Sequence, residues 1–174
     1  MSSVRVEIKM KASIAGTLRN TLVNGPGIRY VVFFQGCSHH CPGCHNPKTW
    51  PTQAPNRQIQ TLIEEIEKNR CLLDGITLSG GEPFEQPEAA LVLAQYAKEA
   101  GLNVWAYTGY TYEELTQTDR YQALLQQIDV LVDGLFIQSL QDDGMKFKGS
   151  KNQRILSLKN GKVIKELIDG FDIW

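Results

Sequence analysis

Three cysteines stand close together in one short stretch of this chain. Cys37, Cys41 and Cys44 follow the spacing C-x3-C-x2-C within residues 36–50, and glycine and proline residues interrupt the same stretch. A segment of this composition does not continue a regular helix or strand, so we expect a loop that folds around a bound group. The chain has 4 cysteines in all, and three of them lie here.

Three kinds of bound group are compatible with this loop. An iron–sulfur cluster normally takes four thiolates, so three would leave one iron open to an added ligand. Zinc is the second candidate, because all three histidines of the chain, His39, His40 and His45, lie in the loop and Cys3His is a common zinc set. Zinc motifs usually add a second short-spaced pair, and the one remaining cysteine, Cys71, stands alone. Disulfides or free thiols are the third reading, and the spacing favours the cluster.

The residues around the loop resemble a known family. C-x3-C-x2-C is the cluster motif of the radical S-adenosylmethionine (SAM) superfamily. The surrounding stretches resemble the activating enzymes of glycyl-radical proteins, above all the activators of anaerobic ribonucleoside-triphosphate reductase. Pyruvate formate-lyase activators share part of this similarity but are longer. The similar stretches are residues 24–29, 33–37, 44–46, 49–50, 78–83, 105–110, 130–134 and 148–153.

The resemblance implies a mechanism and its partners. A [4Fe-4S] cluster would be held by Cys37, Cys41 and Cys44, and its open iron would bind the amino and carboxylate groups of SAM. An electron from the reduced cluster would then cleave SAM to a 5′-deoxyadenosyl radical. That radical would take a hydrogen atom from a backbone glycine of the large subunit of the reductase. Flavodoxin or a similar protein would supply the electron, and no side chain is expected to act as a catalytic acid or base.

Two short segments are expected to contact SAM. One flanks the third cysteine, and the other is a Gly-Gly-Glu sequence after a predicted strand. The residues concerned are Gly43, Cys44, His45, Gly80, Gly81 and Glu82. Paired glycines let a backbone approach a ligand closely, although they also make plain turns, and Glu82 could instead cap the next helix. Many superfamily members carry an aromatic residue against the adenine where this chain has Gly43, so stacking from that position is lost.

The remaining pattern predicts an α/β fold. Strands are expected over residues 4–9, 30–35, 76–79, 104–108 and 130–132, and helices over 59–66, 87–100, 112–117 and 121–128. Alternating strands and helices indicate a parallel sheet. The chain is too short for eight such units. We therefore expect one domain, residues 1–174, with a partial, open (βα) barrel of the radical SAM type and a mainly parallel sheet. A C-terminal hairpin and tail follow from about residue 142, with the hairpin turn at Asn160–Gly161.

Composition limits the classes of partner. The net charge of −1 lacks the basic excess typical of nucleic-acid binding. No apolar stretch is long enough to span a membrane, and no signal peptide is evident, so we expect a cytoplasmic protein. A zinc-stabilised binding module without enzymatic activity is the alternative to the enzyme.

Four further features have open roles. Arg29 is expected either in solvent or on an anion near the site. Asp133 is expected either to face the cleft or to cap a turn. Cys71 is expected to be a small buried residue rather than a fourth ligand. The apolar residues 171–174 would dock on the domain or contact a partner.

Overall fold

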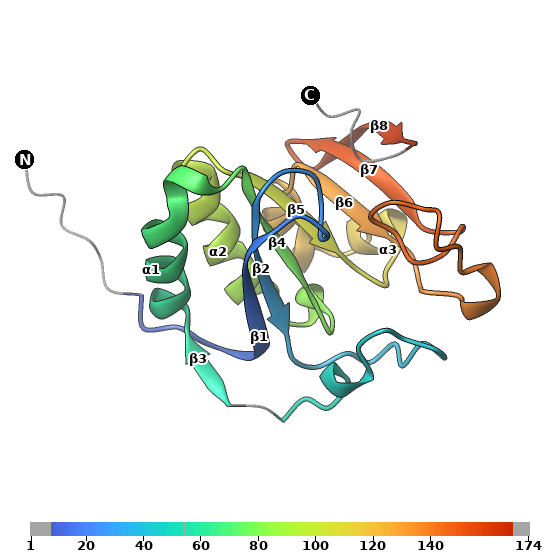
Figure 1. Cartoon of the computed structure of the whole chain (residues 1–174), viewed down its shortest axis with the longest axis horizontal. Coiled ribbons are helices and arrows are strands. Elements are labelled where there is room, and N and C mark those ends of the chain that lie inside the picture. Colours follow the sequence, from blue (N-terminus) through green and yellow to red (C-terminus); the bar gives the residue numbers. More distant parts are fainter. Residues whose placement is uncertain (1–7, 54, 169–174) are drawn as a thin grey trace, which may run out of the picture.

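The computed structural model describes residues 8–53 and 55–168. The strand expected over residues 4–9 falls mostly outside this part, and the described residues 8–10 are not in a strand. The apolar residues 171–174 lie wholly outside it. The described chain forms one sheet with helices packed against it (Figure 1).

Eight strands of the described residues form the sheet, in the order β3-β1-β2-β4-β5-β6-β7-β8. The strands are β1 (Lys11–Thr21), β2 (Arg29–Phe34), β3 (Asn56–Gln58), β4 (Gly75–Gly80), β5 (Asn103–Tyr107), β6 (Val130–Asp133), β7 (Arg154–Lys159) and β8 (Lys162–Leu167). The centre, β2-β4-β5-β6, consists of the four strands predicted as short apolar runs, and these four are parallel. Their carboxyl ends therefore lie along one edge, where α/β sheets place their ligand sites.

The expectation of a mainly parallel sheet is wrong. Four of the seven pairings between neighbouring strands in the described chain are antiparallel, namely β1–β2, β1–β3, β6–β7 and β7–β8. In β1 the buried residues are Ala12 and Ile14, and most of the strand is polar or exposed. The sequence of β1 therefore lacks the apolar alternation that predicts a strand. The sheet is mixed, with a parallel centre and antiparallel strands on both sides.

The predicted hairpin is confirmed. β7 and β8 pair antiparallel across Asn160 and Gly161, whose φ angles are 51° and 74°. Two consecutive residues in this left-handed region make the turn that best matches the twist of a two-residue hairpin. The Asn-Gly sequence is the usual solution, because few other residues adopt a positive φ without strain.

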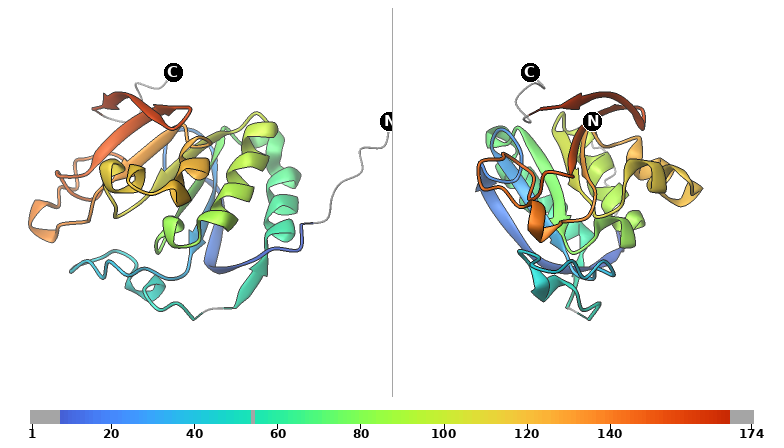
Figure 2. Two further views of the ribbon diagram at one scale, coloured as in Figure 1. Left: turned by 180° about the vertical axis from the view of Figure 1, so that it is seen from behind. Right: turned by 90° about the vertical axis from the view of Figure 1, so that its right-hand side faces the viewer.

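The helices pack on one face of the sheet. They are α1 (Ile59–Asn69), α2 (Pro87–Glu99), α3 (Tyr112–Thr116) and α4 (Gln122–Leu125). Figure 2 shows α1 and α2 side by side over the strands. The apolar stripe of α1 and the small residues of α2 are buried against β2, β4 and β5, and this forms the main core. Each buried Leu or Ile of this kind contributes about 1.5–3 kcal/mol to folding. None of the described helices is long and apolar enough to cross a membrane.

Arg29 is a structural residue, and neither role expected from the sequence is correct. Its side chain is fully buried at the amino end of β2. The guanidinium donates to Thr77 Oγ1 at 2.7 Å, to the Ile76 carbonyl at 2.6 Å, and to the carbonyls of Pro26 and Asn103 at 3.0 and 3.2 Å. Burial lowers the pKa of Arg29 to about 10, which leaves the group charged at neutral pH. The Arg29 side chain therefore joins the start of β2 to β4 and β5, at the edge of the sheet opposite the cysteine loop.

We expect the Arg29→Met variant to lose more than about 3 kcal/mol in free energy of unfolding. The substitution keeps an apolar chain of similar length but leaves several buried carbonyls without donors, each at a cost of ~1–3 kcal/mol. Urea unfolding followed by circular dichroism measures the loss. Arg70→Met is the matched control, because the Arg70 side chain is half-exposed and pairs with Glu67 only at 3.9 Å. Equal unfolding midpoints for the two variants would contradict a structural role for Arg29.

Candidate iron–sulfur and cofactor site

The cysteine loop leaves the carboxyl end of β2 and is closed at its base. The amide of Gly36 donates to the Thr49 carbonyl at 2.7 Å, and that of Cys37 donates to the Trp50 carbonyl at 3.1 Å. The side chain of Gln35 adds bonds to the carbonyls at residues 48 and 51, at 3.0 and 2.6 Å. These bonds join the two ends of the loop, so residues 37–48 project as one unit from the edge of the sheet.

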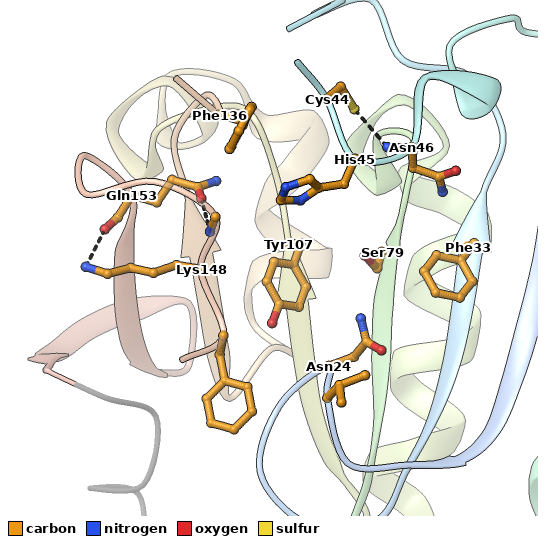
Figure 3. A pocket seen from close by; sticks show the side chains of 13 residues that line it. Asn24, Phe33, Cys44, His45, Asn46, Ser79, Tyr107, Phe136, Lys148 and Gln153 are labelled. Atoms are coloured by element: carbon orange, nitrogen blue, oxygen red, sulfur yellow. Dashed lines mark hydrogen bonds between the residues drawn. The ribbon is translucent and has the colours of Figure 1, made fainter. Parts of the chain in front are cut away.

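Backbone turns within the loop require unusual conformations. His40 and Gly43 have φ angles of 46° and 75°, and the amide of Cys44 donates to the Cys41 carbonyl at 3.1 Å. The amide of Asn46 donates to Cys44 Sγ at 3.3 Å, a bond drawn in Figure 3. An N–H group directed at a ligand sulfur raises the reduction potential of a bound cluster.

The donors of this loop suit a cluster bound by three thiolates. The three loop cysteines are partly exposed free thiols, and Cys71 is the fourth free cysteine. Among the described residues, no three His, Cys, Asp or Glu side chains are gathered closely enough to hold a metal ion. Burial raises the pKa of Cys37 to about 11.

The three histidines of the loop contact groups other than the thiols. His39 lies 3.0 Å from the carboxylate of Glu82, and this hydrogen bond raises the pKa of His39. The ring of His40 packs on Trp50 at 4.9 Å, and that of His45 packs on Phe136 at 5.0 Å. Each histidine ring of the loop is thus engaged with another side chain.

Glu82 holds the loop to the ends of two neighbouring strands. Its carboxylate is fully buried and accepts from the Thr108 hydroxyl at 3.0 Å and from the Gly109 amide at 2.8 Å, both just after β5. It also accepts from the Phe84 amide at 3.0 Å, which caps the short turn after β4. With His39 as the fourth partner, this carboxylate fixes the loop relative to β4 and β5. The cap that Glu82 forms is on the short turn Pro83–Glu85, and not on the expected helix, α2, whose N-cap is Gln86.

The paired glycines pack against the cysteine loop itself. The amide of Gly81 donates to the Phe34 carbonyl and that of Glu82 to the Gly36 carbonyl, both at 2.8 Å. A Cβ atom on Gly81 would overlap the Gly36 carbonyl, and one on Gly80 would overlap the backbone of β2. The glycines are therefore required where β4 ends against the start of the loop. The amides of Gly81 and Glu82 are already used by protein carbonyls.

A pocket of about 380 Å³ lies on the open face of the sheet beside the loop. Phe33, Ser79 and Tyr107 project into it from β2, β4 and β5, and Cys44 and His45 border it from the loop (Figure 3). The structure thus brings two of the six expected SAM contacts to the pocket. Gly43, Gly80, Gly81 and Glu82 do not line it. The other lining residues are Val23, Asn24, Asn46, Phe136, Phe147, Lys148, Gly149 and Gln153.

Several of these lining residues were missed by the sequence reasoning. Tyr107 lies on the pocket wall, where burial raises its pKa strongly. Phe136 and Phe147 come from the connection between β6 and β7, which carries no periodic pattern. The resemblance of residues 148–153 was the one signal that this connection mattered.

Asp133 and Cys71 have roles that the structure resolves. Asp133 is buried at the end of β6, accepts from the Tyr112 amide at 2.7 Å and pairs with Arg154 at 2.5 Å, so it caps α3 and ties β7 to β6. Cys71 is exposed, and the expectation of a buried residue is wrong. It lies before β4, at the amino ends of the parallel strands, whereas the cysteine loop follows their carboxyl ends.

Comparison with known proteins defines the class of protein. Residues 23–156 match a family profile described as a 4Fe-4S single cluster domain. The match includes the whole cysteine loop and the four parallel strands, so the class is that of proteins with one iron–sulfur cluster.

Curated relatives narrow this class. A protein from Vibrio cholerae is 42% identical over 142 residues, which cover 77% of this chain and 90% of the relative. Relatives from Haemophilus influenzae and Salmonella typhimurium are 37% and 36% identical over 146 residues, covering 79% of this chain and 93% and 94% of the relatives. All three are named anaerobic ribonucleoside-triphosphate reductase-activating protein. The chain belongs to this family.

Proposed function

We propose that this protein is a radical SAM activase that installs a glycyl radical on the large subunit of anaerobic ribonucleoside-triphosphate reductase. One observation carries the proposal: a loop with three free cysteines and no fourth borders an open pocket at the carboxyl edge of four parallel strands. The family supports the choice of reductase, because its members are named for activating that enzyme.

The three thiols of Cys37, Cys41 and Cys44 would hold a [4Fe-4S] cluster and leave one iron open for SAM. When bound and reduced, the cluster would supply the electron that cleaves SAM to methionine and a 5′-deoxyadenosyl radical, which takes a hydrogen atom from glycine. The protein's own groups hold the loop in position. The bonds at residues 35–37 close its base, and Glu82 fixes it to β5.

The pocket residues would bind SAM. We assign Cys44 and His45 to the wall formed by the cysteine loop. Ser79 would contribute a hydroxyl from the end of β4. Gly80 and Gly81 would act by letting β4 approach the loop. Glu82 would act through His39 and Gly109 rather than through direct contact. Gly43 would contribute only the backbone turn before Cys44 and no contact with SAM.

The parallel centre of the sheet would correspond to the partial, open (βα) barrel of radical SAM enzymes. Such a short barrel leaves the pocket accessible to a folded partner, as a protein substrate requires. A flavodoxin or similar carrier would reduce the cluster in the cytoplasm.

Electron paramagnetic resonance tests this function. The anaerobically reconstituted and reduced protein is mixed with SAM and the reductase large subunit. We expect a glycyl-radical doublet on the reductase and one 5′-deoxyadenosine released per radical. A reductase variant with alanine in place of the reacting glycine serves as the control and should give no doublet. A doublet formed on pyruvate formate-lyase alone would overturn the choice of substrate.

A further inference from the structure

An aromatic wall lies beside the third cysteine of the loop. The rings of His45 and Phe136 are 5.0 Å apart between centroids and tilted by 48°. Both rings line the pocket that Cys44 and Ser79 border, and Figure 3 shows them on the side of the pocket away from Phe33. Two rings at the edge of an open pocket offer a surface on which a flat heteroaromatic group can pack.

The position before the third cysteine is closed to a side chain. Gly43 has a φ angle of 75°, where any other residue is strained. A Cβ atom there would also lie 2.6 Å from the side chain of Gln138. Gln138 comes from the same connection after β6 as Phe136. This connection therefore fills the space next to Gly43 and at the same time brings an aromatic ring to the pocket.

The start of the connection that carries Phe136 is held by the segment just before β7. Gln153 donates to the Gly134 carbonyl at 2.9 Å, Asn152 donates to the Leu135 carbonyl at 2.8 Å, and the Ser150 hydroxyl accepts from the Ile137 amide at 3.1 Å. These three bonds bracket Phe136 on both sides along the chain.

Gly149 lies directly against the Phe136 ring, where an added Cβ atom would stand 3.0 Å from it. The ring is thus supported by Gly149 and borders the pocket. A ring supported in this way loses little further side-chain freedom when a ligand packs on it.

We propose that Phe136, together with His45, packs against the adenine of SAM and takes the place of an aromatic residue at position 43. The proposal rests on the function proposed above. It makes Phe136 a binding residue that the sequence does not reveal, because 92 residues separate it from Cys44. The hydrogen bonds from Ser150, Asn152 and Gln153 would then serve to hold this ring beside the loop.

Binding measurements on the cluster-loaded protein test the proposal without turnover. We expect Phe136→Leu to weaken SAM binding by about 5- to 150-fold in anaerobic equilibrium dialysis, the range that loss of one aromatic stacking partner gives. Binding of 5′-deoxyadenosine should weaken similarly, whereas binding of methionine, which has no adenine, should stay unchanged. Phe136→Trp should retain the parent affinity. Leu140→Ala is the matched control and should also retain it, because Leu140 is an exposed residue of the same connection and does not line the pocket.

Three outcomes separate the possible errors. Parent-like affinity for SAM in Phe136→Leu would overturn the adenine contact while leaving the proposed function intact. Equal loss of methionine binding would also overturn it, because the variant would then have disturbed the loop and not the adenine surface. Absence of SAM binding to the cluster-loaded parent protein would remove the proposed function itself.

Discussion

Replacement of Cys37, Cys41 or Cys44 by alanine is expected to abolish both cluster binding and SAM cleavage. Three thiolates are the full set of protein ligands in this account, so removing one leaves two irons without a protein donor. Iron and acid-labile sulfide are measured after anaerobic reconstitution, and 5′-deoxyadenosine is measured by chromatography after reduction. We expect each variant to fall to the background of both measurements, because a cluster on two thiolates has no stable protein site.

Cys71→Ala is the matched control for these variants. Cys71 is exposed and lies at the amino ends of the parallel strands, so we expect full iron content and full SAM cleavage. Loss of the cluster from Cys71→Ala would mean that the ligand set has been assigned wrongly. Zinc without iron or sulfide in the parent protein would instead support the non-enzymatic binding module.

Glu82→Ala is expected to lower the free energy of unfolding by more than about 3 kcal/mol. The substitution leaves the amides of Phe84 and Gly109 and the hydroxyl of Thr108 without their acceptor, at ~1–3 kcal/mol for each buried group. It also removes the hydrogen bond from His39, so the cysteine loop loses its polar link through Glu82 to the end of β5. Urea unfolding gives the stability, and iron content after reconstitution reports on the loop.

Glu88→Gln is the control for Glu82. Its carboxylate is largely exposed and pairs with Arg120 at 3.4 Å, so we expect a change of no more than about 0.5 kcal/mol. If Glu82→Ala unfolded at the same urea concentration as Glu88→Gln, the four bonds to Glu82 would contribute nothing measurable. The loop would then have to be positioned by its base and by Ser38, which donates to the Glu85 carboxylate.

Local patterns in the sequence predicted the elements that are buried on one or both faces. The four parallel strands are short apolar runs that end at glycine or polar residues, and α1 carries a regular stripe of Ile59, Leu62, Ile63 and Ile66, so run length, turn residues and periodicity together locate them. The hairpin was predictable because Asn-Gly fits one turn type. β1 was not predictable, because it is mostly exposed and its register is interrupted by irregularities.

Long-range contacts account for what the sequence could not predict. Arg29 looks like a surface residue until β4 and β5 supply its acceptors from 47 to 74 positions away. The contact of Phe136 with the cysteine loop was likewise not predictable, because it forms only when the chain after β6 returns to that loop. The cysteine spacing, in contrast, is a local signal, and it located the centre of the site without any knowledge of the fold.

The most direct test of the account is electron–nuclear double resonance on the reduced cluster with SAM labelled isotopically at its amino nitrogen and carboxylate oxygen. The account predicts hyperfine coupling of both labelled atoms to the cluster in the parent protein, since both would bind the iron that no cysteine occupies. The account would be contradicted if a protein with a full [4Fe-4S] cluster bound SAM but showed neither coupling. A fourth protein ligand would then occupy the iron that is expected to bind SAM.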